Sequence, residues 1–581
     1  MLVSLRSALL ASCLTFSPVT AAGETLTDII ERYEAFSSAG DPEEDARVQG
    51  QEPRVWSTVT PEYIAQRAAE ASDMLQALNG LEDSSAGPET AILRHLLQSH
   101  IDADAYDTAR IPFVGDWGFF AEAPFTAMRT RANTRAKAEA WIARLNDLPR
   151  YFEEHTQNMQ RGIDTGWTAH ADPLATSIAQ IRAQILEDPT ESTLFTPFVS
   201  LDASSLSPEE IDALKISGEA AVETAIIAYQ DLLSFMEETY AVNAREGAGI
   251  ASLEGGREAY AVAVAFHTAG AGYDPEDIHT LGQDEVARIR ADMEAIIEEV
   301  EFEGSFEAFI EFLRTDPQFY AETPEELLEK AAEMSKRLDA ILPRYFGQLP
   351  RLPYGVEAVP AAIAPGYTTG RYSSGDAEKG IAGTYLVNTY ALDQRPLYEL
   401  PALSAHEAVP GHHLQIALAQ ELDDMPEFRK SYYATAFGEG WGLYAEKLAG
   451  EADFYRTPYE RFGQLSYEMW RACRLVADTG LHHYGWNREQ AETCFEENTA
   501  LAPLNIQTEV TRYIGWPGQA TAYKVGELKI LELRAMAKDA LGERFDIRAY
   551  HDVLLGAGAM PLDALESRIE AWVEQVRDET K

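Results

Sequence analysis

The stretch SAHEAVPGHHLQ (residues 404–415) starts like a helical metal-binding motif and is then interrupted by a proline and a glycine. In the plain motif H-E-x-x-H, two histidines four residues apart lie on one face of a helix and bind Zn²⁺ together. The glutamate between them acts as general base. Here His406 and Glu407 form the first half, but Pro410 occupies the place of the second histidine.

Two later histidines, His412 and His413, are candidates for the missing ligand. On an ideal helix, with about 100° and about 1.5 Å per residue, His413 faces the right way but lies roughly 10 Å along the axis, and His412 faces away. The helix must therefore deform if two histidines bind one metal. Pro410 donates no N–H and Gly411 tolerates unusual backbone angles, so a bulge that absorbs two residues would bring His412 to the required position.

A catalytic zinc needs a third protein ligand and an open position for water. The stretch FGEGWGLYAE (residues 437–446) offers two carboxylates among apolar and small residues, where an unpaired charge is costly. Glu439 is the better candidate and Glu446 the alternative. Each could instead be a solvated carboxylate on a helix surface, so the residues alone leave a metal site open.

The rest of the chain predicts a mainly α-helical protein. Apolar residues recur at intervals of three and four in stretches such as 61–81, 217–242 and 284–302. Ser207 and Thr323 each precede a proline and two acids, which is typical of a helix start.

The composition changes at Pro343, where prolines and glycines become frequent up to residue 383. The segment TYLVNTY (residues 384–390) is rich in β-branched and aromatic residues and predicts a strand. We therefore expect an N-terminal helical region (23–342) and a metal-site region (343–581) that form one continuous helical body. A small insertion of strands and loops would precede the metal-binding helix.

The charge of the chain excludes some classes of partner. The 581 residues carry a formal net charge of −48, whereas nucleic-acid backbones and anionic membranes need clustered Lys and Arg. The acidic surface indicates either an adaptation for solubility or an attraction for cationic peptides.

The N-terminus indicates export. Residues 1–22 carry one arginine, an apolar run and small residues, which is typical of a secretory signal peptide. Lipoprotein processing at Cys13 is the alternative. No later segment offers the roughly 18 apolar residues of a membrane span, so the sequence predicts a periplasmic or secreted protein. Cys473 and Cys494 flank a turn and would form either a disulfide or two free thiols.

Four polar residues recur at helical spacing and share one face: Arg471, Arg474, Asp478 and His482. The two arginines would either hold a substrate carboxylate or pair with the abundant acids. Asp478 would orient His482 as a transition-state donor, unless His482 is a core or capping histidine.

Several segments together resemble a widespread bacterial family described only as domain of unknown function 885, DUF885. They are HEAVPGHHLQ, FGEGWGLYAE, RACRLVADTGLHHYGWNREQA and RYIGWPGQATAYKVGELKI. The resemblance extends to GREAYAVAVAFHTAG and GTYLVNTYAL, and so covers most of the chain after residue 22. The family is itself similar to helical zinc peptidases, the gluzincins. Its pattern H-E-x-x-P-G-H implies that His406 and His412 are ligands and that His413 is a neighbour. In the wider peptidase group, an Arg-Tyr pair implies that Tyr513 donates to the oxyanion, with Tyr523 as the alternative.

This resemblance implies an exported zinc peptidase that acts on peptides, since relatives enclose the metal in a helical channel. His406, His412 and Glu439 would bind Zn²⁺, and Glu407 would take a proton from water and pass it to the leaving amine. The strand around Asn388 would pair with the substrate backbone. The alternatives are a metal-dependent hydrolase of a small-molecule amide or ester, and a non-catalytic binding protein.

Overall fold

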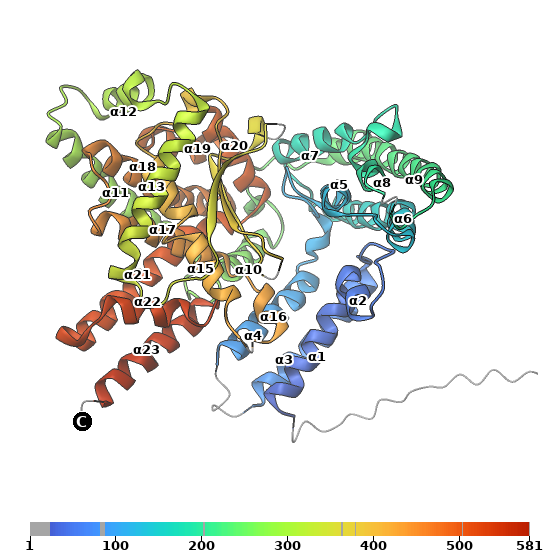
Figure 1. Ribbon diagram of the computed structural model, residues 1–581, viewed down its shortest axis with the longest axis horizontal. Coiled ribbons are helices and arrows are strands. Elements are labelled where there is room, and N and C mark those ends of the chain that lie inside the picture. Colours follow the sequence, from blue (N-terminus) through green and yellow to red (C-terminus); the bar gives the residue numbers. More distant parts are fainter. Residues whose placement is uncertain are drawn as a thin grey trace, which may run out of the picture.

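The computed structural model describes residues 24–81, 87–201, 204–361, 364–377, 379–423, 425–501 and 503–579. The predicted signal peptide and Cys13 lie outside these ranges. The described chain is mainly α-helical with one small sheet, as the sequence predicts (Figure 1). Within the described ranges, none of the helices has the length and apolar character needed to cross a bilayer.

Four helices begin the chain and lie at the lower right of Figure 1. They are α1 (Leu26–Gly40), α2 (Pro42–Val48), α3 (Pro61–Asn79) and α4 (Pro88–Ala105). Their buried residues, such as Ile29 and Leu93, belong to the same hydrophobic cluster as Leu565 and Ile569 near the C-terminus. Among these helices, α4 packs against α23 (Leu562–Asp578), the last helix.

The next helices form a lobe at the upper right of Figure 1. They are α5 (Phe119–Arg129), α6 (Arg135–Thr165), α7 (Ala171–Ala183), α8 (Thr196–Val199) and α9 (Pro208–Phe235). This lobe has its own core, which includes Trp141, Phe198 and Tyr229. The predicted start of α9 is confirmed, because Ser207 and Glu210 form a capping box at its first turn.

Four more helices lead to the sheet: α10 (Gly256–Thr268), α11 (Pro275–Glu299), α12 (Phe306–Thr315) and α13 (Pro324–Tyr345). The predicted cap of α13 is also confirmed, since the Thr323 side chain accepts a hydrogen bond from the Glu326 N–H. The helix continues slightly past its predicted end and contains Pro343 in its last turn.

A three-stranded sheet follows, with the order β1-β3-β2. The strands are β1 (Tyr354–Ala358), β2 (Gly370–Ser373) and β3 (Gly383–Val387). β3 is parallel to β1 and antiparallel to β2, with Tyr385 opposite both Val356 and Tyr372. The predicted strand is thus confirmed but is shorter, and it is the central strand. The free edges of the sheet belong to β1 and β2.

The C-terminal helices include those that carry the candidate site. They are α14 (Leu400–Glu407), α15 (His412–Gln420), α16 (Glu427–Ser431), α17 (Thr435–Glu451), α18 (Pro458–Thr479), α19 (Arg488–Asn498), α20 (Pro503–Gly515), α21 (Ala522–Leu541), α22 (Ile547–Leu555) and α23 (Leu562–Asp578). A disulfide between Cys473 and Cys494 joins α18 to α19. The sequence left open whether these cysteines form a disulfide or two free thiols, and the structure contains the disulfide.

Candidate metal centre

The metal-binding helix is broken rather than bulged. α14 ends at Glu407 and α15 begins at His412, so the predicted bulge is wrong and a turn with a cis Val409–Pro410 bond takes its place. The backbone approaches itself closely here: a Cβ on Gly411 would lie 1.9 Å from the His406 carbonyl oxygen. Only glycine fits this turn, which brings His412 back beside His406.

Trp441 of α17 holds the turn in place. Its indole N–H lies 2.8 Å from the carbonyl oxygen of Pro410 and 3.3 Å from that of Gly411. The Pro410 carbonyl lies in the turn between two helices, and a buried donor from another helix satisfies it. The Gly411 carbonyl also accepts from the Gln415 N–H at the start of α15. The turn is therefore fixed by tertiary contacts as well as by its own sequence.

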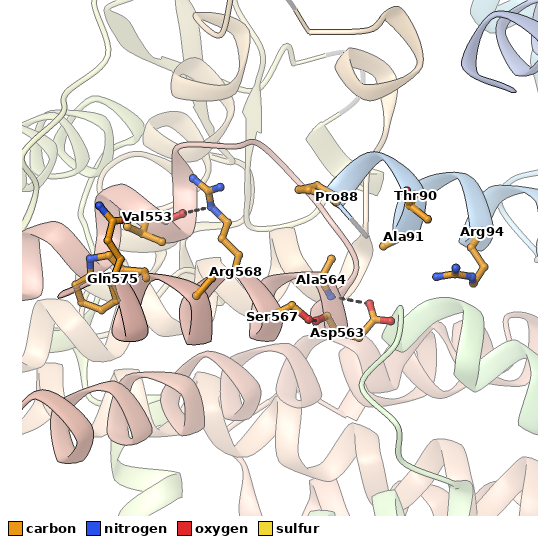
Figure 2. Close-up of a pocket in the computed structure, with 13 residues that line it drawn as sticks. Pro88, Thr90, Ala91, Arg94, Val553, Asp563, Ala564, Ser567, Arg568 and Gln575 are labelled. Carbon is orange, nitrogen blue, oxygen red and sulfur yellow. Dashed lines mark hydrogen bonds between the residues drawn. The ribbon is translucent and has the colours of Figure 1, made fainter. Parts of the chain in front are cut away.

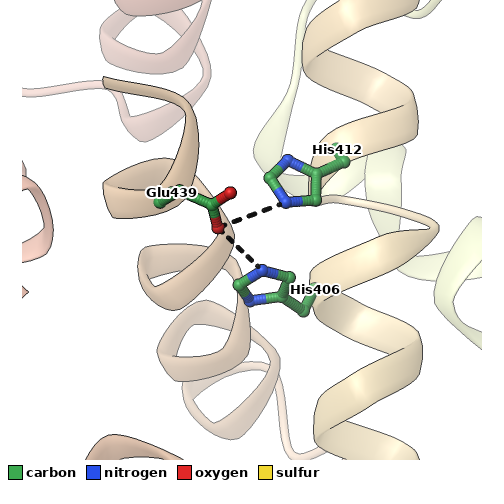
Figure 3. Close-up of side chains that lie close together, drawn as sticks. All are labelled: His406, His412 and Glu439. Carbon is green, nitrogen blue, oxygen red and sulfur yellow. Dashed lines mark ion pairs between the residues drawn. The ribbon is translucent and has the colours of Figure 1, made fainter. Parts of the chain in front are cut away.

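The three predicted ligands meet at this turn (Figure 3). The His406 Nε2 lies 3.5 Å from the Glu439 Oε2, and the His412 Nε2 lies 3.6 Å from the same oxygen. One donor atom from each of the three residues falls within 4.8 Å of the others, so the group could hold a metal ion. Two imidazoles and one carboxylate are a donor set that catalytic zinc uses.

The glycines of α17 make room for this arrangement. A Cβ on Gly442 would lie 2.5 Å from the His406 ring, and one on Gly440 would lie 2.6 Å from the Cα of Gly526. The first contact lets the imidazole lie against α17. The second lets α17 and α21 cross with their backbones in contact. Glu439 therefore projects from a helix that is close to both the histidines and α21.

Glu446 binds the other side of the His406 ring. The Nδ1 of His406 donates to the Glu446 carboxylate at 2.8 Å, and Glu446 is fully buried. This contact leaves Nε2 directed toward Glu439, the orientation that a metal ligand needs. Burial alone would lower the pKa of His406, but Glu439 and Glu446 outweigh it and raise this pKa to about 10. The carboxylates around this ring therefore favour a positive charge here. Glu446, the alternative ligand by sequence, is instead the hydrogen-bond partner of the candidate ligand His406.

Glu407, the predicted general base, lies next to His406 and is 8% exposed. Its Oε2 accepts a hydrogen bond from the backbone N–H of Tyr372 in β2 at 2.7 Å. The carboxylate thus borders the free edge of the sheet and stays beside the His-His-Glu group. The His413 ring is directed toward the sheet, because its Nδ1 lies 3.0 Å from the Tyr372 hydroxyl oxygen. Burial lowers the pKa of His413 to about 4.

Tyr433 was not identified from the sequence, yet it contacts the site. Its hydroxyl donates to the Glu439 Oε1 at 3.3 Å. The residue is 49% exposed, although its hydroxyl end is enclosed by the surrounding helices. Burial and the nearby charges of Glu439 and Tyr523 raise the pKa of Tyr433 well above its usual value. Tyr433 is thus partly exposed to solvent and contacts Glu439 through its hydroxyl. Its only sequence signal is its position six residues before Glu439.

The Tyr513 hydroxyl is engaged elsewhere. It donates to Glu509 at 2.7 Å and accepts from the Arg474 Nε at 3.0 Å and the Trp470 Nε1 at 3.3 Å. Tyr523 has a different place. It lies three residues before Gly526, where α21 touches α17, and the Arg474 guanidinium lies 4.4 Å from its ring centre.

The two predicted arginines differ in their contacts. Arg474 pairs with Glu509 at 3.1 Å, as one of the two interpretations expects. Arg471 forms no ion pair with a described residue; its Nη1 donates to the Tyr467 carbonyl and its guanidinium lies against Tyr467 and Trp470.

His482 is not oriented by Asp478, so that predicted pair is wrong. Asp478 accepts instead from the Tyr260 hydroxyl at 2.6 Å and the Gly518 N–H at 3.0 Å. The two ring nitrogens of His482 contact the Ile250 N–H at 3.1 Å and the Tyr513 carbonyl at 2.9 Å. Burial lowers the pKa of His482 to about 3, so the ring is neutral and links three segments.

Asn388 is fully buried at the end of β3. Its side-chain N–H groups donate to the carbonyls of Ala364, Tyr367 and Thr368, and its oxygen accepts from the Tyr390 N–H. Since β3 is the central strand, the expectation that it pairs with a substrate is wrong. The strand edge beside Glu407 belongs to β2.

An open pocket of about 480 Å³ lies elsewhere, between α4 and α23 (Figure 2). Its lining includes Arg94, Arg568 and Trp572. Arg568 donates to the Val553 carbonyl at 2.8 Å. None of the candidate site residues lines this pocket, so its size does not bear on the metal centre.

Residues 42–569 match the family described as "Bacterial protein of unknown function (DUF885)", and the chain belongs to this family. The structure of "the putative lipoprotein from Colwellia psychrerythraea" is 26% identical, covers 95% of this chain and 99% of its own, and has a TM-score of 0.85. A "putative lipoprotein of unknown function from Shewanella oneidensis" is 16% identical, with 94% and 99% covered and a TM-score of 0.75, and shows the same fold. No curated protein is significantly similar in sequence.

Proposed function

We propose that this DUF885 protein is an exported zinc-dependent peptidase that hydrolyses oligopeptides. The observation that carries the proposal is the His406, His412 and Glu439 group with Glu407 beside it and Glu446 behind it. The donor set fits Zn²⁺, and a buried carboxylate on the far nitrogen of one histidine is typical of zinc ligands. When bound, Zn²⁺ would polarise the scissile carbonyl and lower the pKa of a water.

The protein's own residues would carry the proton transfers. Glu407 takes a proton from the attacking water and passes it to the leaving amine. The hydrogen bond from the Tyr372 N–H holds one oxygen of Glu407, and the other oxygen has no partner among the described residues. That free oxygen is the one available to the water.

An extended peptide fits the surroundings of Glu407. Among the described residues, β2 pairs with no strand other than β3, and the Tyr372 N–H on its outer edge donates to Glu407. A peptide could add to this edge by backbone hydrogen bonds, which demand little of its sequence. This edge supports a peptide substrate over a small-molecule amide or ester.

The negative charge that develops on the carbonyl oxygen needs a donor. Of the two tyrosines that the sequence offers, Tyr523 is favoured, since the Tyr513 hydroxyl already has three partners. Tyr523 also lies one turn from the contact between α21 and α17, the helix of Glu439.

An envelope location is supported by the Cys473–Cys494 disulfide, because disulfides persist in oxidising compartments. The names of the two relatives support a lipid anchor. In this chain the lipid would be attached to Cys13, which would then remain in the mature protein.

The test is metal analysis of the purified protein together with digestion of a mixed peptide library, read by mass spectrometry. We expect about one zinc per chain, the occupancy of a mononuclear catalytic site. Glu407→Gln should keep the zinc and lose about 10²–10⁴-fold in turnover, because an amide cannot accept the proton. Bound zinc with an uncut library would favour the small-molecule hydrolase. Absence of zinc would favour a binding protein.

A further inference from the structure

Arg474 and Arg512 share a single carboxylate. The Glu509 Oε2 lies 3.1 Å from the Arg474 Nη2 and 3.3 Å from the Arg512 Nη1, and it also accepts from the Tyr513 hydroxyl. No other carboxylate of the described residues lies within ion-pair distance of either guanidinium. The second partner of Arg512 is the neutral side chain of Gln519. The cluster therefore has one positive charge in excess, in a chain whose net charge is −48.

This excess charge lies inside the protein. Arg474 is 4% exposed, and its Nη1 has no hydrogen-bond partner. A buried cation without full pairing is costly, and a carboxylate ligand would supply the missing partner. The Arg512 side chain is 25% exposed, which gives an incoming group access to the cluster.

Tyr523 and α21 link the cluster to the helix that carries Glu439. The Arg474 guanidinium lies 4.4 Å from the Tyr523 ring centre. Tyr523 is one turn before Gly526, whose backbone touches Gly440 of α17, and Glu439 directly precedes Gly440. Arg474 therefore lies against Tyr523, one helical turn along α21 from the contact with α17 that adjoins Glu439.

Aromatic rings form the walls of the cluster. Arg474 lies 4.7 Å from the Trp470 ring centre, and Arg512 lies 5.8 Å from that of Trp516, which is 38% exposed. Apolar walls strengthen the attraction between a guanidinium and an anion because they exclude water. The planar guanidinium also matches the two oxygens of a carboxylate.

We infer that Arg474 and Arg512 form a subsite for a substrate carboxylate, the free C-terminal carboxylate of a peptide whose scissile bond lies at the metal centre. The inference rests on the proposed peptidase function and narrows its substrates to peptides with a free C-terminus. A side-chain carboxylate offers the same chemistry, and the experiment separates the two sources.

The experiment uses one peptide in three forms: with a free C-terminal acid, with a C-terminal amide, and with the amide and a glutamate as the last residue. Binding to zinc-loaded Glu407→Gln protein is measured by calorimetry, and cleavage by the unmodified protein is measured in parallel. We expect the free acid to bind about 10–100-fold more tightly than the amide, the range for a hydrogen bond to a charged group. The glutamate should not restore binding.

Three variants test the residues. Arg512→Gln removes one guanidinium, and Gln519→Glu places a competing carboxylate beside Arg512. Both should reduce the preference for the free acid to within about twofold. Arg461→Gln is the matched control, since Arg461 pairs with Glu299 at the surface, and should keep the preference.

The outcomes separate the two proposals. Cleavage without any preference between acid and amide overturns the subsite and leaves the peptidase in place. A binding preference without cleavage by the unmodified protein overturns the peptidase and keeps the subsite. If the glutamate restores binding, the cluster binds a side-chain carboxylate, and the inference is overturned. If the preference for the free acid survives both Arg512→Gln and Gln519→Glu, the arginines do not form the subsite, and the inference is also overturned.

Discussion

Replacing Glu446 with glutamine should weaken zinc binding without touching a ligand. The Glu446 carboxylate lies 2.8 Å from the Nδ1 of His406 and is fully buried. In Glu446→Gln an amide oxygen can still accept the Nδ1–H, so the orientation of the ring is kept. What is lost is one negative charge next to a ligand whose task is to hold a cation.

The size of the effect follows from this contact. A hydrogen bond to a charged group contributes about 1.5–3 kcal/mol and a neutral one about 0.5–1.5 kcal/mol. The difference of about 1–1.5 kcal/mol predicts roughly a tenfold loss of zinc affinity for Glu446→Gln. Glu446→Ala also removes the hydrogen bond, and its loss should approach the upper end of the 10- to 100-fold range typical of such partners, about 100-fold.

The assay is competition for zinc against a chelator of known affinity, at one pH, with thermal melting of the metal-free proteins alongside. Glu451→Gln is the control, because Glu451 is on the same helix and pairs with Arg534 at the surface. If Glu446→Gln binds zinc as tightly as Glu451→Gln does, Glu446 stabilises the helix packing only, and the reasoning about the cation site is refuted.

Three further predictions concern other residues. Metal analysis should find that His412→Ala abolishes zinc binding while His413→Ala keeps most of it, since the His413 Nδ1 faces the sheet. The reverse result would show that this assignment of the ligands is wrong. In peptide cleavage, Tyr523→Phe should lower kcat far more than it raises KM, and should raise the activation free energy by roughly 2.7–4 kcal/mol. Tyr513→Phe should have a much smaller effect on kcat. A large kcat loss in Tyr513→Phe alone would return the oxyanion role to that residue. Burial raises the pKa of Asp478 from 3.8 to about 7, so the folded state holds its proton more tightly and the free energy of unfolding falls as the pH rises through this window. Asp478→Asn should flatten this dependence in melting curves recorded at several pH values, and an unchanged slope would contradict it.

The helices could be predicted because their signals are local. Ser207 and Thr323 form side-chain hydrogen bonds with residues three positions later. The caps of α9 and α13 can therefore be recognised from four consecutive residues. The turn between α14 and α15 is different. Its proline and glycine mark an interruption, but whether the helix bulges or breaks depends also on Trp441, which donates to Pro410 from 31 residues away.

The polar residues of α18 show where helical spacing stops being informative. A separation of four residues places Asp478 and His482 on one face, but it does not state which partners face them. The Tyr260 hydroxyl and the Gly518 N–H donate to an Asp478 oxygen, and the Ile250 N–H donates to a His482 nitrogen. These partners come from segments that the fold alone brings together, so the expected pair does not form.

The spacing of Glu439 and Glu446 in the sequence is itself informative. Residues seven apart lie on the same face of a helix, two turns from each other. An imidazole lying along that face can therefore meet one carboxylate with each nitrogen, and His406 does so, with Nε2 toward Glu439 and Nδ1 on Glu446. Gly442 lies between the two carboxylates in sequence, and any larger residue there would collide with the ring. The two acids therefore occupy the two nitrogens of one imidazole, and they are not alternatives for a single place beside it.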